Sequence, residues 1–224
     1  MSIDRAGWPF IAGALLLAVV AVWFRGGFWA LPFFILAGFF AFFFRDPDRH
    51  IPDDPSLVVS PADGRVMIVG EAKAPGTPAG TWQQISIFLS PMDVHVNRAP
   101  VGGVVRRVEY HPGKFLPAYR EDAGTHNEWT EVWFDHRGTL IICRQIVGIL
   151  ARRIVTRLTV GQQVARGERF GIMKFGSRID LFLPRDATVT VNVGDRVVGG
   201  ESRLATLTSV TTASPSAEVL GVTK

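Results

Sequence analysis

Two long apolar runs begin the chain, and a polar, proline-rich stretch follows them. Residues Trp8 to Phe24 contain no charged residue, and neither do residues Phe28 to Phe44, which are rich in phenylalanine. Each run is about 17 residues long, near the lower limit for a helix that spans a bilayer. Arg25-Gly26-Gly27 separates the two runs. The pattern predicts a helical hairpin over residues 1–45, with its tip at these three residues.

The distribution of arginines around this hairpin predicts how it is oriented in a membrane. Arg5, Arg45 and Arg49 lie on one side of it and Arg25 on the other. By the positive-inside rule, the N-terminus and everything after residue 45 face the cytoplasm, at the cell (inner) membrane. A cleaved signal peptide is disfavoured, because the first basic region is weak and no small-residue cleavage site separates the two runs. Pro32 and the shortness of the runs leave open whether the hairpin spans the bilayer or enters one leaflet.

From residue 56 the pattern changes to short runs of β-branched and aromatic residues between Gly, Pro, Asn and Asp. No later stretch has a clear helical period, although Ile149 to Arg157 is ambiguous. The sequence therefore predicts a mainly β domain over residues 56–207, a proline-punctuated linker over 46–55 and a flexible tail over 208–224. The predicted strands are Val58–Val59, Arg65–Val69, Gln84–Leu89, Val104–Tyr110, Thr130–Phe134, Thr139–Val147 and Arg178–Leu183.

Two internal echoes refine the predicted fold. The segment Pro61 to Val66 resembles Pro100 to Val105, and Gly161 to Glu168 resembles Gly194 to Glu201. The second pair shares the pattern Gly-x-x-Val-x-x-Gly-Glu, which is typical of a turn, a short strand and another turn. It is similar to the repeat of sandwiched-barrel hybrid domains of the biotinyl and lipoyl type, and chance similarity between glycine-rich turns is the alternative.

Composition limits the possible partners. Among 224 residues, 24 basic side chains face 20 acidic ones, for a net charge of +4 without a long basic run. This mild excess suits an anionic membrane surface at least as well as nucleic acid, and we expect no nucleic-acid partner. The chain has one cysteine, Cys143, within an apolar run, so it cannot form an internal disulfide.

A glycine-serine pair between two strand-like runs is the first candidate for chemistry. Gly176 precedes Ser177, and apolar segments flank the pair on both sides. Glycine can adopt strained backbone conformations that leave its carbonyl open to the next side chain. Attack by the Ser177 hydroxyl would convert the amide to an ester and prepare chain cleavage. An ordinary β-turn is the other interpretation of the pair.

Other polar residues cluster in strand-turn settings. Asp63 lies in a Pro/Gly turn, where a capping role is the ordinary explanation. In an extended segment Asp93, His95 and Asn97 share one face. His126 lacks ligand spacing to another His or Cys, as does His111, so we expect no metal.

Taken together, these motifs resemble the short bacterial and archaeal form of the phosphatidylserine decarboxylase family. The similarity runs from about residue 40 to 205 and comprises several separate motifs in the same order. The motifs are Phe44-Arg45-Asp46-Pro47-Asp48-Arg49, Ser60-Pro61-Ala62-Asp63-Gly64, the segment Phe88 to Pro100, Pro112-Gly113-Lys114-Phe115, and the segment Lys174 to Leu181.

The resemblance implies a proenzyme that cuts itself without hydrolysis between Gly176 and Ser177. Residues 1–176 and 177–224 would form a heterodimer of the two cleavage chains, and the resemblance leaves a higher oligomer open. Ser177 would become a pyruvoyl group, which forms a Schiff base with the amine of phosphatidylserine and accepts electrons as CO2 leaves. The product is phosphatidylethanolamine, so the enzyme would be a carboxy-lyase of phospholipid biosynthesis. It would need neither pyridoxal phosphate nor a metal, and its lipid substrate fits a membrane hairpin.

The resemblance also implies roles for single residues. His95 is the candidate general acid that returns a proton to the substrate carbon. Asp63 would orient a base, or hold that base in its charged form, during self-cleavage. Larger relatives have a second His where this chain has Arg98, and that His is the base that deprotonates the serine during self-cleavage. In this chain His95 would act as that base as well, or His126 would replace it. Larger relatives have Ser or Thr where this chain has Arg178. The candidate substrate-binding residues are Arg178, Arg98 and His126.

Two other classes of function compete with this interpretation. Met173-Lys174 resembles the site of biotin attachment in a carrier domain, which would predict a modified Lys174 and an intact chain. A membrane-anchored serine hydrolase would use Ser177, His95 and Asp63 as a triad, but the chain lacks the Gly-x-Ser-x-Gly motif. A structural adaptor explains none of the motifs.

Overall fold

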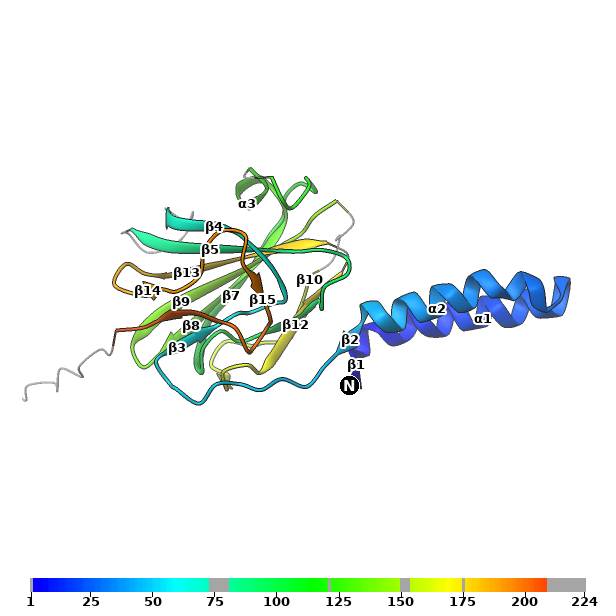
Figure 1. Cartoon of the computed structure of the whole chain (residues 1–224), viewed down its shortest axis with the longest axis horizontal. Coiled ribbons are helices and arrows are strands. Elements are labelled where there is room, and N and C mark those ends of the chain that lie inside the picture. The colour runs from blue at the N-terminus through cyan, green and yellow to red at the C-terminus, as the bar shows by residue number, and fades with distance from the viewer. Residues whose placement is uncertain (1, 73–80, 121, 150–153, 175, 209–224) are drawn as a thin grey trace, which may run out of the picture.

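A pair of N-terminal helices projects from one side of a β domain (Figure 1). The computed structural model describes residues 2–72, 81–120, 122–149, 154–174 and 176–208. Residues 209–224 of the predicted tail lie outside this range. The helices are η1 (Arg5–Gly7), α1 (Trp8–Arg25), η2 (Gly27–Ala30), α2 (Leu31–Phe43) and α3 (Ala123–His126).

The hairpin formed by α1 and α2 confirms the prediction from the apolar runs. Small residues such as Ala14, Ala18 and Ala37 are buried in it, whereas Trp23 and Phe28 near the tip are more than four-fifths exposed. Close approach through small residues is typical of helices that pack in lipid. Residues Arg5–Arg25 are long and apolar enough to cross a membrane, and the second helical segment is shorter.

Contacts at the base of the hairpin tie it to the β domain. Strand β1 (Ser2–Ile3) pairs antiparallel with β2 (Arg45–Asp46), so the two ends of the hairpin are held together. Arg157 of the β domain donates two hydrogen bonds to Asp4, at 2.6 and 2.8 Å. The sequence placed Asp46 in an irregular linker; it lies in a strand because residues far along the chain supply its partner.

The β domain contains the seven predicted strands and several shorter ones. Apart from β12, which has five residues, the strands that the sequence did not indicate have two to four residues, too few to carry a periodic pattern. The strands are β3 (Leu57–Val59), β4 (Gly64–Ala72), β5 (Trp82–Leu89), β6 (Val96–Arg98), β7 (Gly103–His111), β8 (Trp129–His136), β9 (Thr139–Ile146), β10 (Ile154–Thr156), β11 (Gln163–Val164), β12 (Arg169–Met173), β13 (Ser177–Pro184), β14 (Thr188–Val189), β15 (Arg196–Val197) and β16 (Arg203–Thr206).

The strand order shows that the domain is built from two similar halves. One sheet has the order β11-β7-β8-β9-β13-β5-β4-β15, and the other two are β10-β12-β6 and β14-β16-β3. Exchanging β3–β5 with β6–β8, and β9–β12 with β13–β16, gives the large sheet again, read from its other end, and converts each small sheet into the other. The halves therefore meet at the β9–β13 pair, in the middle of the large sheet.

The internal echoes of the sequence coincide with these halves. Val164 of β11 pairs with Gly103, and Val197 of β15 pairs with Gly64. The glycines that begin the two echoes, Gly161 and Gly194, both have positive φ, at 87° and 98°. The Gly161 N–H donates a 2.8 Å hydrogen bond to β7, and the Gly194 N–H donates one of the same length to β4, the strand that corresponds to β7 in the other half. The prediction of a mainly β domain with internal repeats is confirmed.

A buried ion pair lies on the face of the large sheet opposite the main core. Arg144 donates to Glu131 on the neighbouring strand at 2.5 and 2.8 Å, and both residues are 1% exposed. The guanidinium also lies 4.0 Å from the centre of the Trp129 ring. Two charges without water depend on each other, because either one alone would be desolvated and uncompensated.

Replacing Arg144 by methionine is expected to lower the free energy of unfolding by about 3 to 5 kcal/mol, because the Glu131 charge loses its partner. The measurement is chemical denaturation of the full-length chain in detergent. Arg106→Met is the matched control, since Arg106 pairs with Asp135 at 2.6 Å but is 60% exposed. The control is expected to cost less than about 1 kcal/mol. Equal losses for the two variants would contradict the prediction.

Candidate active site

Gly176 and Ser177 lie where the chain enters β13, one of the two central strands of the large sheet. Gly176 has φ +70°, in the left-handed region that favours glycine. Ser177 is fully buried, and its hydroxyl has no hydrogen-bond partner among the described residues. A buried hydroxyl without a hydrogen bond loses its hydration and gains nothing in return, so the Ser177 hydroxyl lowers the stability of the fold. Such a group is available for chemistry.

The other half of the domain contains a counterpart of this pair. The register places Thr139 at the position of Ser177 and Gly138 at that of Gly176, and Gly138 also has positive φ, at 85°. There the pair closes the tight turn between β8 and β9, and the Gly138 N–H donates 2.8 Å to Asp135. Thr139 is half-buried, whereas Ser177, at the equivalent position, is buried. The two positions share a backbone geometry and differ in their surroundings.

His95 contacts the backbone of Gly176. The Gly176 N–H donates to His95 Nε2 at 3.2 Å, while His95 Nδ1 lies 2.9 Å from the Asp93 carbonyl oxygen. A carbonyl only accepts, so Nδ1 carries the proton and Nε2 is the free acceptor of a neutral ring. His95 is fully buried. Burial lowers the pKa of His95 to about 4, and the nearby Arg45 charge acts in the same direction.

Gly148 makes room for the carbonyl of Gly176. A Cβ at position 148 would lie 2.5 Å from the Gly176 oxygen and 3.2 Å from the Ala118 side chain. No side chain fits there unless the carbonyl at the candidate cleavage point or the segment around Gly148 moves. Gly148 is therefore part of the site by its lack of a side chain.

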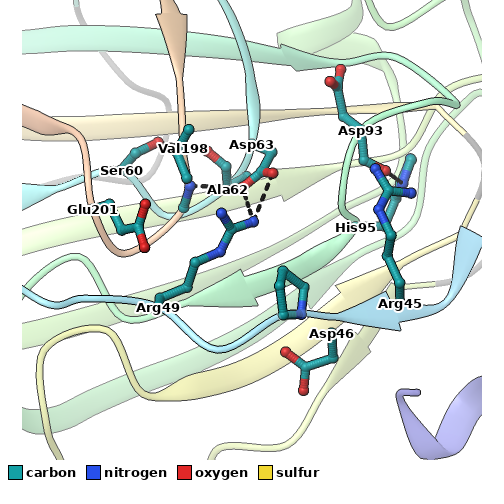
Figure 2. Close-up of polar contacts among 12 residues, drawn as sticks. Arg45, Asp46, Arg49, Ser60, Ala62, Asp63, Asp93, His95, Val198 and Glu201 are labelled. Atoms are coloured by element: carbon teal, nitrogen blue, oxygen red, sulfur yellow. Dashed lines mark hydrogen bonds and ion pairs between the residues drawn. The ribbon is translucent and has the colours of Figure 1, made fainter. Parts of the chain in front are cut away.

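Asp63 lies in the turn before β4, where the structure gives it other partners than His95. Arg49 donates to both of its carboxylate oxygens, at 2.8 and 3.0 Å, and the Gly199 N–H donates at 2.8 Å. Figure 2 shows this pair apart from the group formed by Arg45, Asp93 and His95. Asp63 thus connects the segment after β2 to the turn after β15.

The three candidate substrate-binding residues do not surround Ser177. Arg178 alternates to the opposite face of β13, where it is 2% exposed and donates to Asp180 at 2.6 and 2.9 Å. Arg98 donates to Asp46 at 3.1 Å and to two carbonyl groups, and so holds the hairpin base on the β domain. His126 is exposed in α3.

An apolar pocket of about 130 Å³ opens beside Gly176. It is lined by Phe88, Pro91, Pro117, Ala118, Tyr119, Ile149 and Gly176. Tyr119 and Ile149 are more than half exposed at its rim. The pocket can receive an apolar group next to the candidate cleavage point. Within the described residues, no three His, Cys, Asp or Glu side chains lie together in a way that could hold a metal.

The position of Lys174 weakens the carrier interpretation. Its ammonium lies 4.9 Å from the centre of the Phe10 ring and 6.0 Å from that of Phe44, both in the hairpin base. A carrier needs a lysine that projects freely from a turn, whereas this one is half-buried against aromatic rings. The triad of a serine hydrolase is not assembled either, since Ser177 lacks a hydrogen bond to His95.

Sequence reasoning missed three residues of the site. Arg49 belongs to the motif after the hairpin but received no role. Phe43, whose ring packs on His95, reads in the sequence as one more apolar residue of a helix. Gly148 follows a predicted strand and carries no local signal. All three act through contacts with residues distant in the sequence, which no local pattern reveals.

Comparison with known proteins places these features in context. The sequence model of one family, phosphatidylserine decarboxylase, matches residues 36–205. A protein of Symbiobacterium thermophilum named phosphatidylserine decarboxylase proenzyme is 47% identical over 204 residues, covering 89% of this chain and 93% of its own. A protein of Nitrosomonas europaea with the same name is 42% identical over 204 residues, covering 91% and 94%. One of Anaplasma phagocytophilum, also so named, is 42% identical over 216 residues, covering 95% and 94%.

Proposed function

Because the chain belongs to the phosphatidylserine decarboxylase family, a family of carboxy-lyases, we propose that it cuts itself between Gly176 and Ser177 and then decarboxylates phosphatidylserine. The observation that carries the proposal is the buried Ser177 hydroxyl, which has no hydrogen-bond partner in the part of the chain that the structure describes and directly follows a glycine of positive φ. The product would be phosphatidylethanolamine, in phospholipid biosynthesis.

Self-cleavage follows from the chemistry of the pair. Ser177 Oγ attacks the Gly176 carbonyl carbon, so that a C–O bond replaces the C–N bond and the hydroxyl proton passes to the Ser177 nitrogen. Loss of the Ser177 Cα proton then expels the Gly176 carboxylate and ends the chain at residue 176. Water replaces the nitrogen of residue 177, which leaves as ammonia, and a pyruvoyl group remains. His95 is the titratable side chain in contact with Gly176, so we assign these proton transfers to it.

The residues around Ser177 fit a pyruvoyl group at that position. Such a group supplies a carbonyl that binds the substrate amine and draws electrons away as CO2 leaves. His95 would return the proton to the substrate carbon, and the apolar pocket at Gly176 would take the part of the lipid next to its head group. The contacts of Asp63 with Arg49 and Gly199 support a positioning role for Asp63.

The position of β13 supports a stable heterodimer of the two cleavage chains. After a cut at residue 177, β13 would still pair with β5 over eight residues and with β9 over five. Strands β15 and β16 would add pairs with β4 and β3. The smaller chain would thus stay in the centre of the sheet. The hairpin would hold the site at the membrane, where the lipid substrate resides.

The intact mass of the purified protein tests the proposal. We expect two chains, 1–176 and 177–224, the smaller with a blocked N-terminus that reacts with a carbonyl reagent. The counterpart pair Gly138-Thr139 is a control within the chain, because it shares the positive φ, whereas the contacts of His95 and Gly148 described above are with Gly176. A single chain of 24.6 kDa in the folded protein, or a second cut after Gly138, would contradict the proposed role of the site.

A further inference from the structure

The hairpin reaches into the candidate active site through one aromatic side chain. Phe43 is the last residue of α2 and is fully buried. Its ring centre lies 4.3 Å from that of His95, with 33° between the two planes. Phe43 and Phe44 form one buried apolar cluster with Val94, Val96 and Ile172 of the β domain. The hairpin therefore ends in contact with His95, the side chain that accepts a hydrogen bond from the Gly176 N–H.

Three contacts together define the position of His95. The Asp93 carbonyl holds Nδ1 at 2.9 Å, the Gly176 N–H approaches Nε2 at 3.2 Å, and the Phe43 ring covers a face. The two hydrogen bonds fix the ring nitrogens, but they leave both faces of the ring open. The Phe43 ring packed on one face restricts rotation of the imidazole about its Cβ–Cγ bond and excludes water from that face.

We propose that Phe43 is a positioning residue for His95, and that the seating of the hairpin on the β domain thereby controls self-cleavage. In this arrangement Phe43 keeps His95 as a dry, neutral acceptor aimed at Gly176. The proposal rests on the proposed function where it concerns self-cleavage, but not where it concerns the state of His95.

The charged groups near His95 act in the same direction or are already paired. Arg45 follows the hairpin, lies 3.9 Å from the Phe42 ring centre, and disfavours a second positive charge at His95. The Asp93 carboxylate pairs with Arg196 at 3.1 Å, and it is the Asp93 backbone that contacts His95. Lys174 lies over the Phe44 ring. Burial is the larger cause of the low pKa of His95, and Phe43 provides part of that burial.

Loss of the Phe43 ring is therefore expected to let water reach His95 and raise its pKa toward the ordinary value of 6.5. A protonated ring has two N–H donors and cannot accept from the Gly176 N–H. The contact at the cleavage point would then weaken as the pH falls through the raised pKa. Above that pKa the ring would be neutral again, and cleavage would recover as far as its orientation allows.

The first test follows His95 directly by NMR of histidine-labelled, full-length Ser177→Ala chain in lipid nanodiscs. A His95→Gln variant assigns its signal among the five histidines. With Phe43 present, we expect no titration of His95 between about pH 5.5 and 8. In Phe43→Ala, we expect the pKa to rise by about two units, so that His95 titrates within this range, and in Phe43→Leu, which keeps an apolar cover, we expect a smaller rise. Phe34→Ala is the matched control, because Phe34 belongs to α2 but is 53% exposed.

The second test measures how fast chain 177–224 appears in cell-free synthesis with nanodiscs. Phe43→Ala is expected to cleave about two- to fourfold more slowly near pH 6 than near pH 8, as a His95 pKa between about 6 and 6.5 implies, while wild type and Phe34→Ala differ little. A Phe43→Ala chain with the wild-type titration and pH profile would overturn the proposal, as would slowing that is equal at every pH. If no chain cleaves, including wild type, the proposed function fails, and the NMR titration still decides whether Phe43 positions His95.

Discussion

Replacing Ser177 by alanine is expected to leave one chain of 24.6 kDa with no decarboxylase activity. The change removes the attacking oxygen and the atom from which the carbonyl would be made, so the loss of activity should exceed about a thousandfold. It removes no hydrogen bond, because the hydroxyl has no partner among the described residues. The fold should therefore be unchanged. Denaturing gels, intact mass and an assay of CO2 release measure the two effects.

Ser86→Ala is the matched control for this variant. Ser86 is also fully buried in the large sheet, but its hydroxyl contacts Arg178 at 3.1 Å and Gln84 at 2.9 Å. Its loss should cost stability, by about 1 kcal/mol for each bond, and leave self-cleavage intact. A Ser177→Ala chain that is still cut at residue 176 would show that another group opens the bond.

Replacing Gly148 by alanine is expected to slow self-cleavage by about a hundredfold, because a displacement of about 1 Å at a reacting centre has an effect of that size. The new Cβ would lie 2.5 Å from the Gly176 oxygen, so the carbonyl or the segment around Gly148 must move. The rate at which chain 177–224 appears measures the effect. Gly148→Val should be slower still, since its side chain is larger.

Gly70→Ala provides the control for the Gly148 variants. Gly70 lies in β4, and a Cβ there would meet no atom within 4 Å. We expect wild-type cleavage from it. If Gly148→Ala also cleaves at the wild-type rate while its fold is intact, the tight approach of position 148 to the Gly176 carbonyl does not matter for the reaction.

Much of the architecture could be predicted from local patterns. The charged and glycine residues that bound the apolar runs placed α1 and α2 to within three residues, because a helix in lipid excludes charge over its whole length. Gly161 and Gly194 marked the internal repeats, because turns of positive φ require glycine at fixed positions. Seven strands followed from β-branched and aromatic runs, whereas strands such as β11 and β15 exist only by pairing with β7 and β4.

The candidate site divides in a similar way. Gly176, Ser177 and His95 were recognisable from residue type and motif order. The contacts of Asp63 with Arg49, and of Arg178 with Asp180, were not, because the sequence does not say which charges meet. Arg178 follows Ser177 directly, yet the alternation of a strand places its side chain on the other face.

The sequence by itself determined the apolar hairpin, the β-rich repeat domain and the chemistry available at Gly176 and Ser177. These depend on residue type and short-range period, which are local properties of a chain. Only the tertiary structure decided that the Ser177 hydroxyl has no partner among the described side chains and backbone, that Gly148 accommodates the Gly176 carbonyl, and that Phe43 covers His95. Burial and contact arise between segments far apart in the chain, and they set the pKa of His95 and the exposure of each reacting atom.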